Sequence, residues 1–202
     1  MSHRTEGKPP PTAPERDCTP PPSRDDLLEL ARARFRVDGL FEMRELADAL
    51  GVSRATVYRW AGNRELLLGE VLWDLTGRTL AWARDQARGD GAPYLVEVFE
   101  RFVVAVDESA PLRRFLLRDP ELALRVLTSR HGVVQTRLVA AVRDMFRAAE
   151  ERGSFRPAID LDTLAYAAVR LGEAFVYSDV ITGTDRDVRR AVDVLRLLLR
   201  GM

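Results

Sequence analysis

From Ser23 to the carboxyl terminus, apolar residues recur three and four positions apart, which is the spacing of an α-helix. Capping residues and glycines divide this pattern into segments, and the expected N-caps of the fourth helix and of the last two helices are Asn63, Asp160 and Thr184. Ser23 with Asp26 begins the first helix and Gly39 ends it, and no stretch shows the alternation typical of a strand. The pattern predicts an all-α fold, with helices near residues 23–38, 43–50, 53–60, 63–89, 93–109, 111–118, 120–129, 132–152, 159–182 and 185–200.

Two of these helices are only about eight residues long, and the turn 50–52 joins them as a helix-turn-helix. Gly51 ends the first helix, and Ser53 is a natural N-cap for the second. Leu46 and Val57 can pack where the two helices cross. The side chains expected to face away from the core are those of Ser53, Arg54, Ala55, Tyr58 and Arg59.

Positive charge is concentrated in this second short helix. The chain as a whole has 31 basic and 31 acidic residues, so it lacks the overall basic character of many nucleic-acid binders. Between residues 53 and 64, however, the charged residues are Arg54, Arg59 and Arg64, and this stretch contains no Asp or Glu. Arginine can pair bidentately with guanine in the major groove or hold phosphates beside it. Helical domains that bind no DNA also have corners with surface arginines, so the spacing alone leaves both interpretations open.

A series of short motifs runs through residues 39–67. They are Leu46-Ala47, Gly51-Val52-Ser53, Thr56-Val57-Tyr58, the aromatic Trp60 and the run Arg64-Glu65-x-Leu67. In this register the segment resembles the DNA-binding domain of TetR-family transcriptional repressors. The resemblance implies a three-helix DNA-binding head, a long fourth helix and an all-helical body that binds a ligand and dimerises. Residues 60–73 further resemble a branch of the family that controls quorum-signal degradation.

The resemblance also implies roles for individual residues. Tyr58 matches a tyrosine that contacts phosphate, and Arg64 stands where a lysine usually contacts phosphate at the start of the fourth helix. Glu42 departs from the family pattern, because serine or threonine often caps the second helix there. The predicted DNA-contacting residues are Arg44, Ser53, Arg54, Ala55, Thr56, Tyr58, Arg59 and Arg64.

The last two predicted helices carry more apolar surface than one small body covers. Such surface predicts a four-helix interface between two copies of the chain, although ordinary core helices would show the same pattern. The apolar positions are Leu161, Leu164, Ala165, Ala168, Leu171, Gly172, Phe175, Val188, Ala191, Val192, Leu195, Leu198 and Leu199.

Helix 159–182 also has a polar face, with Tyr166, Arg170, Glu173 and Tyr177 at spacings of four, three and four. Arg170 and Glu173 can form a surface ion pair, or the four side chains can line a pocket. A pocket of this composition is apolar and neutral overall, which suits an uncharged, partly aliphatic molecule such as an acyl chain or a lactone. Its predicted lining is Trp82, Phe99, Phe102, Val103, Met145, Tyr166, Arg170, Glu173 and Tyr177.

Composition divides the chain into three parts. Residues 1–22 hold seven of the eleven prolines and almost nothing apolar, which predicts a disordered tail. We expect the helix-turn-helix DNA-binding domain over residues 23–68 and the ligand-binding and dimerisation domain over residues 69–202. The amino terminus does not resemble a signal peptide, and the apolar runs are too short to cross a bilayer. These features predict a soluble, cytoplasmic protein without membrane contact.

The sequence predicts a ligand-responsive transcriptional repressor. We expect it to bind a palindromic operator in double-stranded DNA as a homodimer and to be released by a small hydrophobic effector. Catalysis is not expected, because His131 is the only histidine after the tail and no phosphate loop or nucleophile motif occurs. We expect no cofactor and no metal. The alternative is a protein-interaction or nucleoid module without a ligand, against which the long apolar body argues.

Overall fold

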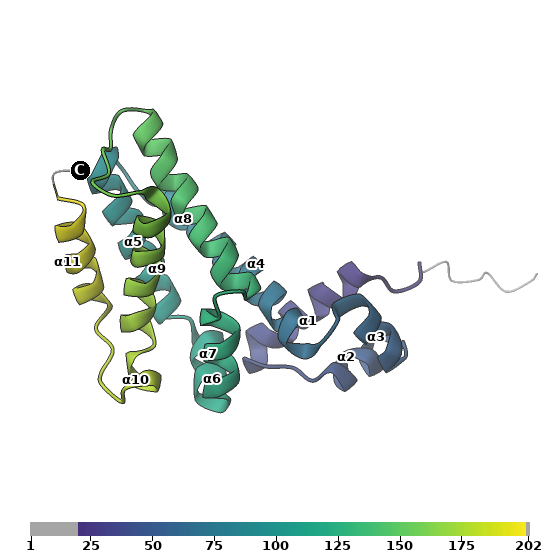
Figure 1. Ribbon diagram of the computed structural model, residues 1–202. Helices are drawn as coiled ribbons and strands as arrows, with labels where there is room; N and C mark the ends of the chain where they lie inside the picture. Colours follow the sequence, from purple (N-terminus) through teal and green to yellow (C-terminus); the bar gives the residue numbers. More distant parts are fainter. Residues whose placement is uncertain (1–19, 201–202) are drawn as a thin grey trace, which may run out of the picture.

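The computed structural model describes residues 20–200, and over this range it contains eleven helices and no strand (Figure 1). The predicted all-α fold is therefore confirmed. Cys18 and most of the predicted tail lie outside the described residues. The helices are α1 (Arg24–Asp38), α2 (Met43–Leu50), α3 (Arg54–Ala61), α4 (Arg64–Gln86), α5 (Gly91–Asp107), α6 (Ala110–Arg118), α7 (Pro120–Thr128), α8 (Val133–Glu151), α9 (Leu161–Val176), α10 (Ser178–Ile181) and α11 (Val188–Leu198).

Helices α1, α2 and α3 form a small bundle at one end of the molecule, which we call the head (Figure 1). Ser23 and Asp26 form the predicted capping box at the start of α1. Gly39 ends α1 in the left-handed conformation, with φ 74°. The side chains that close the core of the head are Leu27, Ala31, Phe35, Met43, Leu46, Ala47 and Val57.

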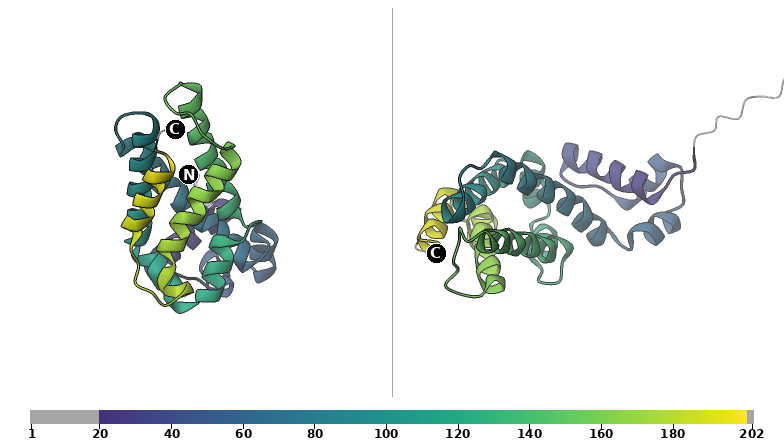
Figure 2. Two further views of the ribbon diagram at one scale, coloured as in Figure 1. Left: turned by 60° about the vertical axis from the view of Figure 1, so that its left-hand side comes forward. Right: turned by 90° about the horizontal axis from the view of Figure 1, so that it is seen from above.

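Helix α4 runs from the head into the rest of the chain, which we call the body (Figure 2). Asn63 caps its first turn by accepting a hydrogen bond from the Leu66 amide at 2.8 Å, as predicted. One side of α4 packs on α1 of the head, and further along it packs on α5 and α8 of the body. A single helix thus contributes buried side chains next to both the head and the body.

The body is formed by α5 to α11 (Figure 2), and its buried apolar side chains are continuous with those of the head. Helix α8 packs on α4 and α9, and α11 packs on α5 and α9. The short helices α6 and α7 lie between the other body helices and the head, where α6 packs on α1 (Figure 1). In the described part of the chain, no helix is both long and apolar enough to cross a membrane.

The prediction of one continuous helix over 159–182 is wrong, because the chain leaves the helical conformation at Tyr177, with φ −108° and ψ 13°. Side chains replace the helical hydrogen bonds at this point. Arg113 Nη2 donates to the Val176 carbonyl at 3.0 Å, and Ser178 Oγ donates to the Phe175 carbonyl at 3.1 Å. Asp160 caps α9 as predicted, since it accepts from the Thr163 amide at 2.8 Å.

The predicted cap of the last helix is also wrong. Helix α11 begins at Val188, after Asp187, and not at Thr184. The Thr184 hydroxyl lies 2.8 Å from the Thr182 hydroxyl instead. This loop therefore satisfies its polar groups locally, which delays the start of the helix.

Candidate DNA-binding surface and ligand cavity

The helix-turn-helix is built as its local sequence predicts. Gly51 adopts φ 64°, and its amide donates to the carbonyls of Ala47 and Asp48. The Val52 amide then donates to the Ala47 carbonyl at 3.1 Å, which closes the end of α2. Ser53 starts α3 by accepting from the Thr56 amide at 3.1 Å. The turn therefore fixes α3 relative to α2 through the backbone.

One side of helix α3 packs on α1 and α2, and the other side is exposed. Val57 is its only fully buried residue. The side chains of Arg54, Ala55, Tyr58 and Arg59 are exposed. Among the described residues, neither Arg54 nor Arg59 forms an ion pair, so both guanidinium groups are available to a phosphate or a base edge.

The other four predicted DNA-contacting side chains already have partners within the protein. The Ser53 and Thr56 hydroxyls lie 3.0 Å apart and bond to each other. Arg44 is exposed and lies 3.7 Å from Asp48 on the same helix. Arg64 donates from Nη2 to Glu42 at 2.8 Å, so its charge is already compensated.

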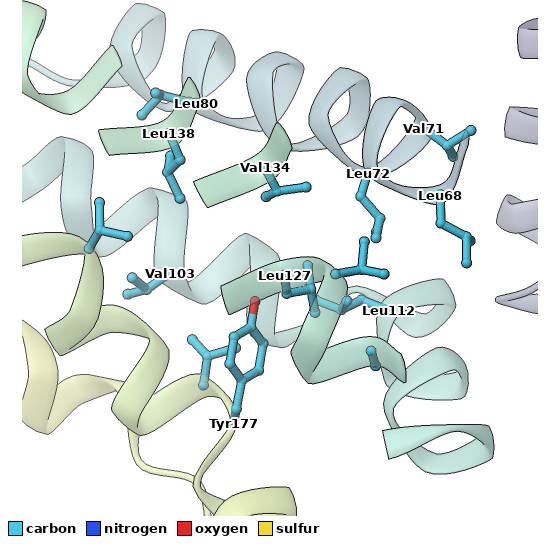
Figure 3. Packing of buried hydrophobic residues seen from close by; sticks show 14 of the residues in the cluster. Leu68, Val71, Leu72, Leu80, Val103, Leu112, Leu127, Val134, Leu138 and Tyr177 are labelled. Carbon is cyan, nitrogen blue, oxygen red and sulfur yellow. The ribbon is translucent and has the colours of Figure 1, made fainter. Parts of the chain in front are cut away.

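The body contains a cavity of about 300 Å³ between α4, α5, α8 and α9. This volume is at the lower end of the range for small-molecule sites, roughly 300–1,000 Å³. Its wall is mainly aliphatic and aromatic, and Figure 3 shows part of it. Six of the predicted ligand-binding residues line it, namely Phe99, Phe102, Val103, Met145, Glu173 and Tyr177.

Two polar side chains from the α9 segment reach the cavity. Tyr177 is almost fully buried, and its hydroxyl points inward toward Leu127 (Figure 3). Burial raises the pKa of the Tyr177 phenol, so the hydroxyl stays protonated. None of the hydrogen bonds among residues 20–200 involves it. This hydroxyl is therefore a free donor inside an apolar space.

Glu173 is the second polar group, and its side chain is only 12% exposed. Its carboxylate accepts from Arg170 Nη1 at 2.8 Å. Burial nevertheless raises the pKa of Glu173 to about 7, because the loss of hydration outweighs the attraction of Arg170. The cavity thus contains a carboxyl group that changes charge near neutral pH.

Three predicted ligand-binding residues are not brought to the cavity wall. Trp82 and Tyr166 are exposed to 46% and 47%. Arg170 lies beside the Tyr166 ring and donates from Nη2 to the Thr128 carbonyl at 3.0 Å. The sequence pattern placed Tyr166, Arg170, Glu173 and Tyr177 on one helix face, but mainly the carboxyl-terminal half of α9 faces the cavity.

The cavity has lining residues that the sequence pattern did not indicate. Arg36 of α1 and Arg78 of α4 contribute to its wall, as do Thr76 and Ser109. The residues of α1 come from the head, so the cavity touches both parts of the chain. No periodicity in the sequence reveals this, because it depends on how α1 lies against α4.

The head and the cavity meet through helix α6. Phe35 of α1 and Phe115 of α6 pack edge to face, with ring centroids 5.7 Å apart. Arg114 Nη2 donates to the Arg36 carbonyl at 2.9 Å. Leu112, on the same short helix, lines the cavity. Helix α6 is therefore in contact with the cavity on one side and with α1 on the other.

Apolar side chains remain exposed on α11. Leu197 and Leu198 are 64% and 45% exposed, and Val194 beside them is 39% exposed. Leu195, which the sequence pattern assigned to the same apolar surface, is only 1% exposed and belongs to the body core. The outer apolar surface of α11 is thus formed by residues 194, 197 and 198.

The chain is similar to known regulators along most of its length. Residues 90–200 match the family model described as the C-terminal domain of tetracyclin repressor-like proteins. A curated relative, the HTH-type transcriptional regulator YdgC of Bacillus subtilis, is 23% identical over 184 residues, which cover 89% of this chain and 92% of the relative.

Solved structures show the same similarity. The transcriptional repressor QsdR of R. erythropolis, from the TetR family, superimposes with a TM-score of 0.81 at 30% identity, over 87% of this chain and 93% of QsdR. The regulator FadR of Bacillus subtilis, solved in complex with stearoyl-CoA, has a TM-score of 0.53 at 15% identity, over 87% and 97% of the two chains. The second comparison shows a shared fold alone.

Proposed function

This chain belongs to the TetR family of transcriptional regulators, and from that premise we propose that it is a ligand-responsive repressor. It binds a palindromic operator as a homodimer and is released by a small hydrophobic effector. The observation that carries this proposal is the contact of helix α6 with both the cavity and the DNA-binding head. Residues 23–68 form the DNA-binding domain, and residues 69–202 form the ligand-binding and dimerisation domain.

Helix α3 is the proposed reading element in the major groove. Arg54 and Arg59 are exposed and have no acidic partner within residues 20–200, which supports base or phosphate contacts. Tyr58 is 48% exposed, four residues after Arg54 on the same helix, and it supplies a hydroxyl for a phosphate. The small side chain of Ala55 permits close approach. Ser53, Thr56, Arg44 and Arg64 complete the proposed contact surface.

Dimerisation uses the outer surfaces of α9 and α11 in this proposal. The exposed leucines of α11 support it, since a cluster of large apolar side chains on one helix face is typical of a protein interface. A two-fold dimer presents two α3 helices in opposite directions. Its operator is then palindromic, with half-sites about one helical turn, or a multiple of it, apart.

The effector fills the cavity in the body. An apolar wall with Tyr177 and Glu173 as polar groups suits a hydrophobic molecule that carries few hydrogen-bonding atoms. FadR of Bacillus subtilis, which shares the fold, was solved with stearoyl-CoA. The effector releases DNA by binding one arrangement of the two heads better than the other.

The test begins with selection of duplexes from a random library by the full-length protein. We expect a palindromic consensus that the variant Arg54→Ala/Arg59→Ala no longer selects. Arg34→Ala is the matched control, because Arg34 is exposed on α1, away from α3. Fluorescence anisotropy of the labelled consensus then reports release by candidate effectors. Binding that ignores competitor sequence and depends on salt alone would contradict the proposal and favour a nucleoid-type module.

A further inference from the structure

Helices α1 and α4 lie side by side in a fixed register. Arg24 Nε donates to the Trp60 carbonyl at 3.2 Å, near the end of α3 and just before α4 begins, and Arg32 Nε lies 3.2 Å from Asp74, nearly three turns into α4. Because the later residue of α1 contacts the later position in the chain, α1 and α4 run in the same direction. One helical turn beyond the Arg32–Asp74 pair, this register brings Arg36 next to Arg78. Both of these residues line the cavity.

The cavity therefore reaches the solvent between two arginines. The side chains of Arg36 and Arg78 are exposed while they also contribute to the cavity wall. The hydroxyl-bearing residues Thr76 and Ser109 line the same cavity. Ser109 immediately precedes α6, whose Pro111 carbonyl lies 2.8 Å from where a Cβ on Gly39 would stand, so the start of α6 adjoins the end of α1. We call this region, defined by Arg36, Arg78, Thr76 and Ser109, the cavity mouth.

Protein carboxylates balance only part of the positive charge at the cavity mouth. Asp74 is shared, since it lies 3.2 Å from Arg32 and 3.0 Å from Arg78. The guanidinium of Arg36 has no acidic partner and no hydrogen-bond acceptor among residues 20–200. The nearest acidic residues in sequence, Asp38 and Glu108, form no ion pair with these arginines in that range.

We infer that the ligand of this cavity is an amphipathic carboxylate, such as a fatty acid anion, whose carboxylate lies at the cavity mouth between Arg36 and Arg78. Guanidinium groups bind carboxylates through paired, charge-assisted hydrogen bonds. The aliphatic chain extends into the cavity beside Phe102 and Val103. This inference rests on the proposed function, in which the cavity is the effector site.

The opposite orientation is disfavoured by the same cavity. A carboxylate pushed inward would meet Glu173, which is already paired with Arg170. Two carboxylates in an apolar space repel each other strongly unless one is protonated. Charge at both ends of the cavity therefore selects the direction in which an anionic chain enters. Arg36 belongs to the head and Arg78 to α4, so the bound carboxylate also bridges the two.

The experiment compares three probes with the same chain, dodecanoate, 1-dodecanol and dodecyltrimethylammonium, by isothermal titration calorimetry on the full-length protein. We expect dodecanoate to bind about fivefold more tightly than dodecanol, which is the upper end for one exposed ion pair, and we expect the difference to shrink with added salt. Arg36→Gln and Arg78→Gln should each reduce the preference while leaving dodecanol binding unchanged. Arg34→Gln, on the same helix but outside the cavity, should keep it.

The inference is overturned if dodecanol binds as tightly as dodecanoate, or if the preference survives both arginine changes. In either case the uncharged chain still binds, so the proposed hydrophobic effector site stands. Absence of binding by all three probes overturns the inference and the effector class together, and operator binding then tests the remaining part of the proposed function. If Arg78→Gln fails to fold because Asp74 loses a partner, Arg36→Gln decides alone, since its side chain has no partner in the described residues.

Discussion

The guanidinium of Arg64 donates to the Glu42 carboxylate at 2.8 Å and, through Nε, to the Phe41 carbonyl at 3.1 Å. Arg64 is the first residue of α4, and Glu42 is the N-cap residue of α2 without a capping bond of its own. The pair therefore ties the starts of two helices together. The pair also offsets a positive charge that the family resemblance assigns to a DNA phosphate, so Glu42 competes with DNA for Arg64.

Removing the carboxylate should release that charge. We expect Glu42→Gln to raise the affinity for every duplex similarly and to steepen the salt dependence by about one phosphate contact, a slope change of roughly 0.9. Anisotropy titrations at several salt concentrations, on the selected operator and on an unrelated duplex, measure both quantities. Glu45→Gln is the control, because it removes the same charge from an exposed position on α2 that has no ion pair in the described chain. An equal gain in Glu45→Gln would mean that only overall charge matters.

The outer surface of α11 gives a prediction about assembly. Leu197→Glu with Leu198→Glu should produce a folded monomer, because both side chains are exposed in the single chain and their burial is needed only between copies. Sedimentation velocity measures the mass, and circular dichroism checks the fold. Leu117→Glu on α6, where the leucine is 77% exposed, should remain dimeric. A dimeric double variant would place the interface on another surface.

The helices and their caps could be predicted because they depend on local chemistry. Ser23, Ser53, Asn63 and Asp160 each cap a helix as expected, since an N-cap needs only its own side chain and the next turn. The break at Tyr177 could not be predicted this way. It depends on Arg113, more than sixty residues away in sequence, which takes over a helical carbonyl.

The faces of the body helices were harder to predict for a related reason. Periodicity identifies an apolar stripe but not the neighbour that covers it. Leu195 and Leu198 therefore looked equivalent, although the structure buries the first and exposes the second. Likewise, Glu173 reaches the cavity while Tyr166 on the same helix faces solvent. Arg36 lines the cavity only because of the way α1 lies against α4, and the residue pattern of one helix does not reveal how it packs on another.

Glu173 makes stability depend on pH near neutrality. Burial raises its pKa from the usual 4.5 to about 7, so the folded state holds a proton that the unfolded state releases. The stabilisation from that proton is complete below about pH 4.5 and is lost as the pH rises through about 7. Relative to Glu173→Gln, the free energy of unfolding of the natural chain should therefore fall across this window by up to about 3 kcal/mol.

Urea denaturation at a series of pH values measures this difference. Glu121→Gln is the control, because Glu121 is exposed on α7 and forms no ion pair within residues 20–200. Its stability should follow that of the natural chain at every pH, since both retain Glu173. Parallel curves for Glu173→Gln and the natural chain would show that the Glu173 carboxyl is not buried as the structure places it.

A substitution of Gly39 tests the contact between the head and α6. It has φ 74°, and a Cβ there would stand 2.8 Å from the Pro111 carbonyl and 2.9 Å from the Phe115 amide. Both are backbone atoms of α6, so the helix itself has to move. Gly183 is a matched position, with φ 71° and no atom within 4 Å of its added Cβ. Gly183→Ala should cost about 1–2 kcal/mol from the left-handed backbone alone.

Gly39→Ala should cost roughly 2–4 kcal/mol, because displacement of α6 adds to the same backbone strain. It should also weaken effector response more than operator binding, since α6 lines the cavity and packs on α1 and α7, whereas α3 packs on α1, α2 and α4. Thermal unfolding gives the two stability costs, and anisotropy with and without effector gives the response. If Gly39→Ala and Gly183→Ala respond to effector equally well, the contact between α1 and α6 does not carry the signal, and α4 remains as the connection between cavity and head.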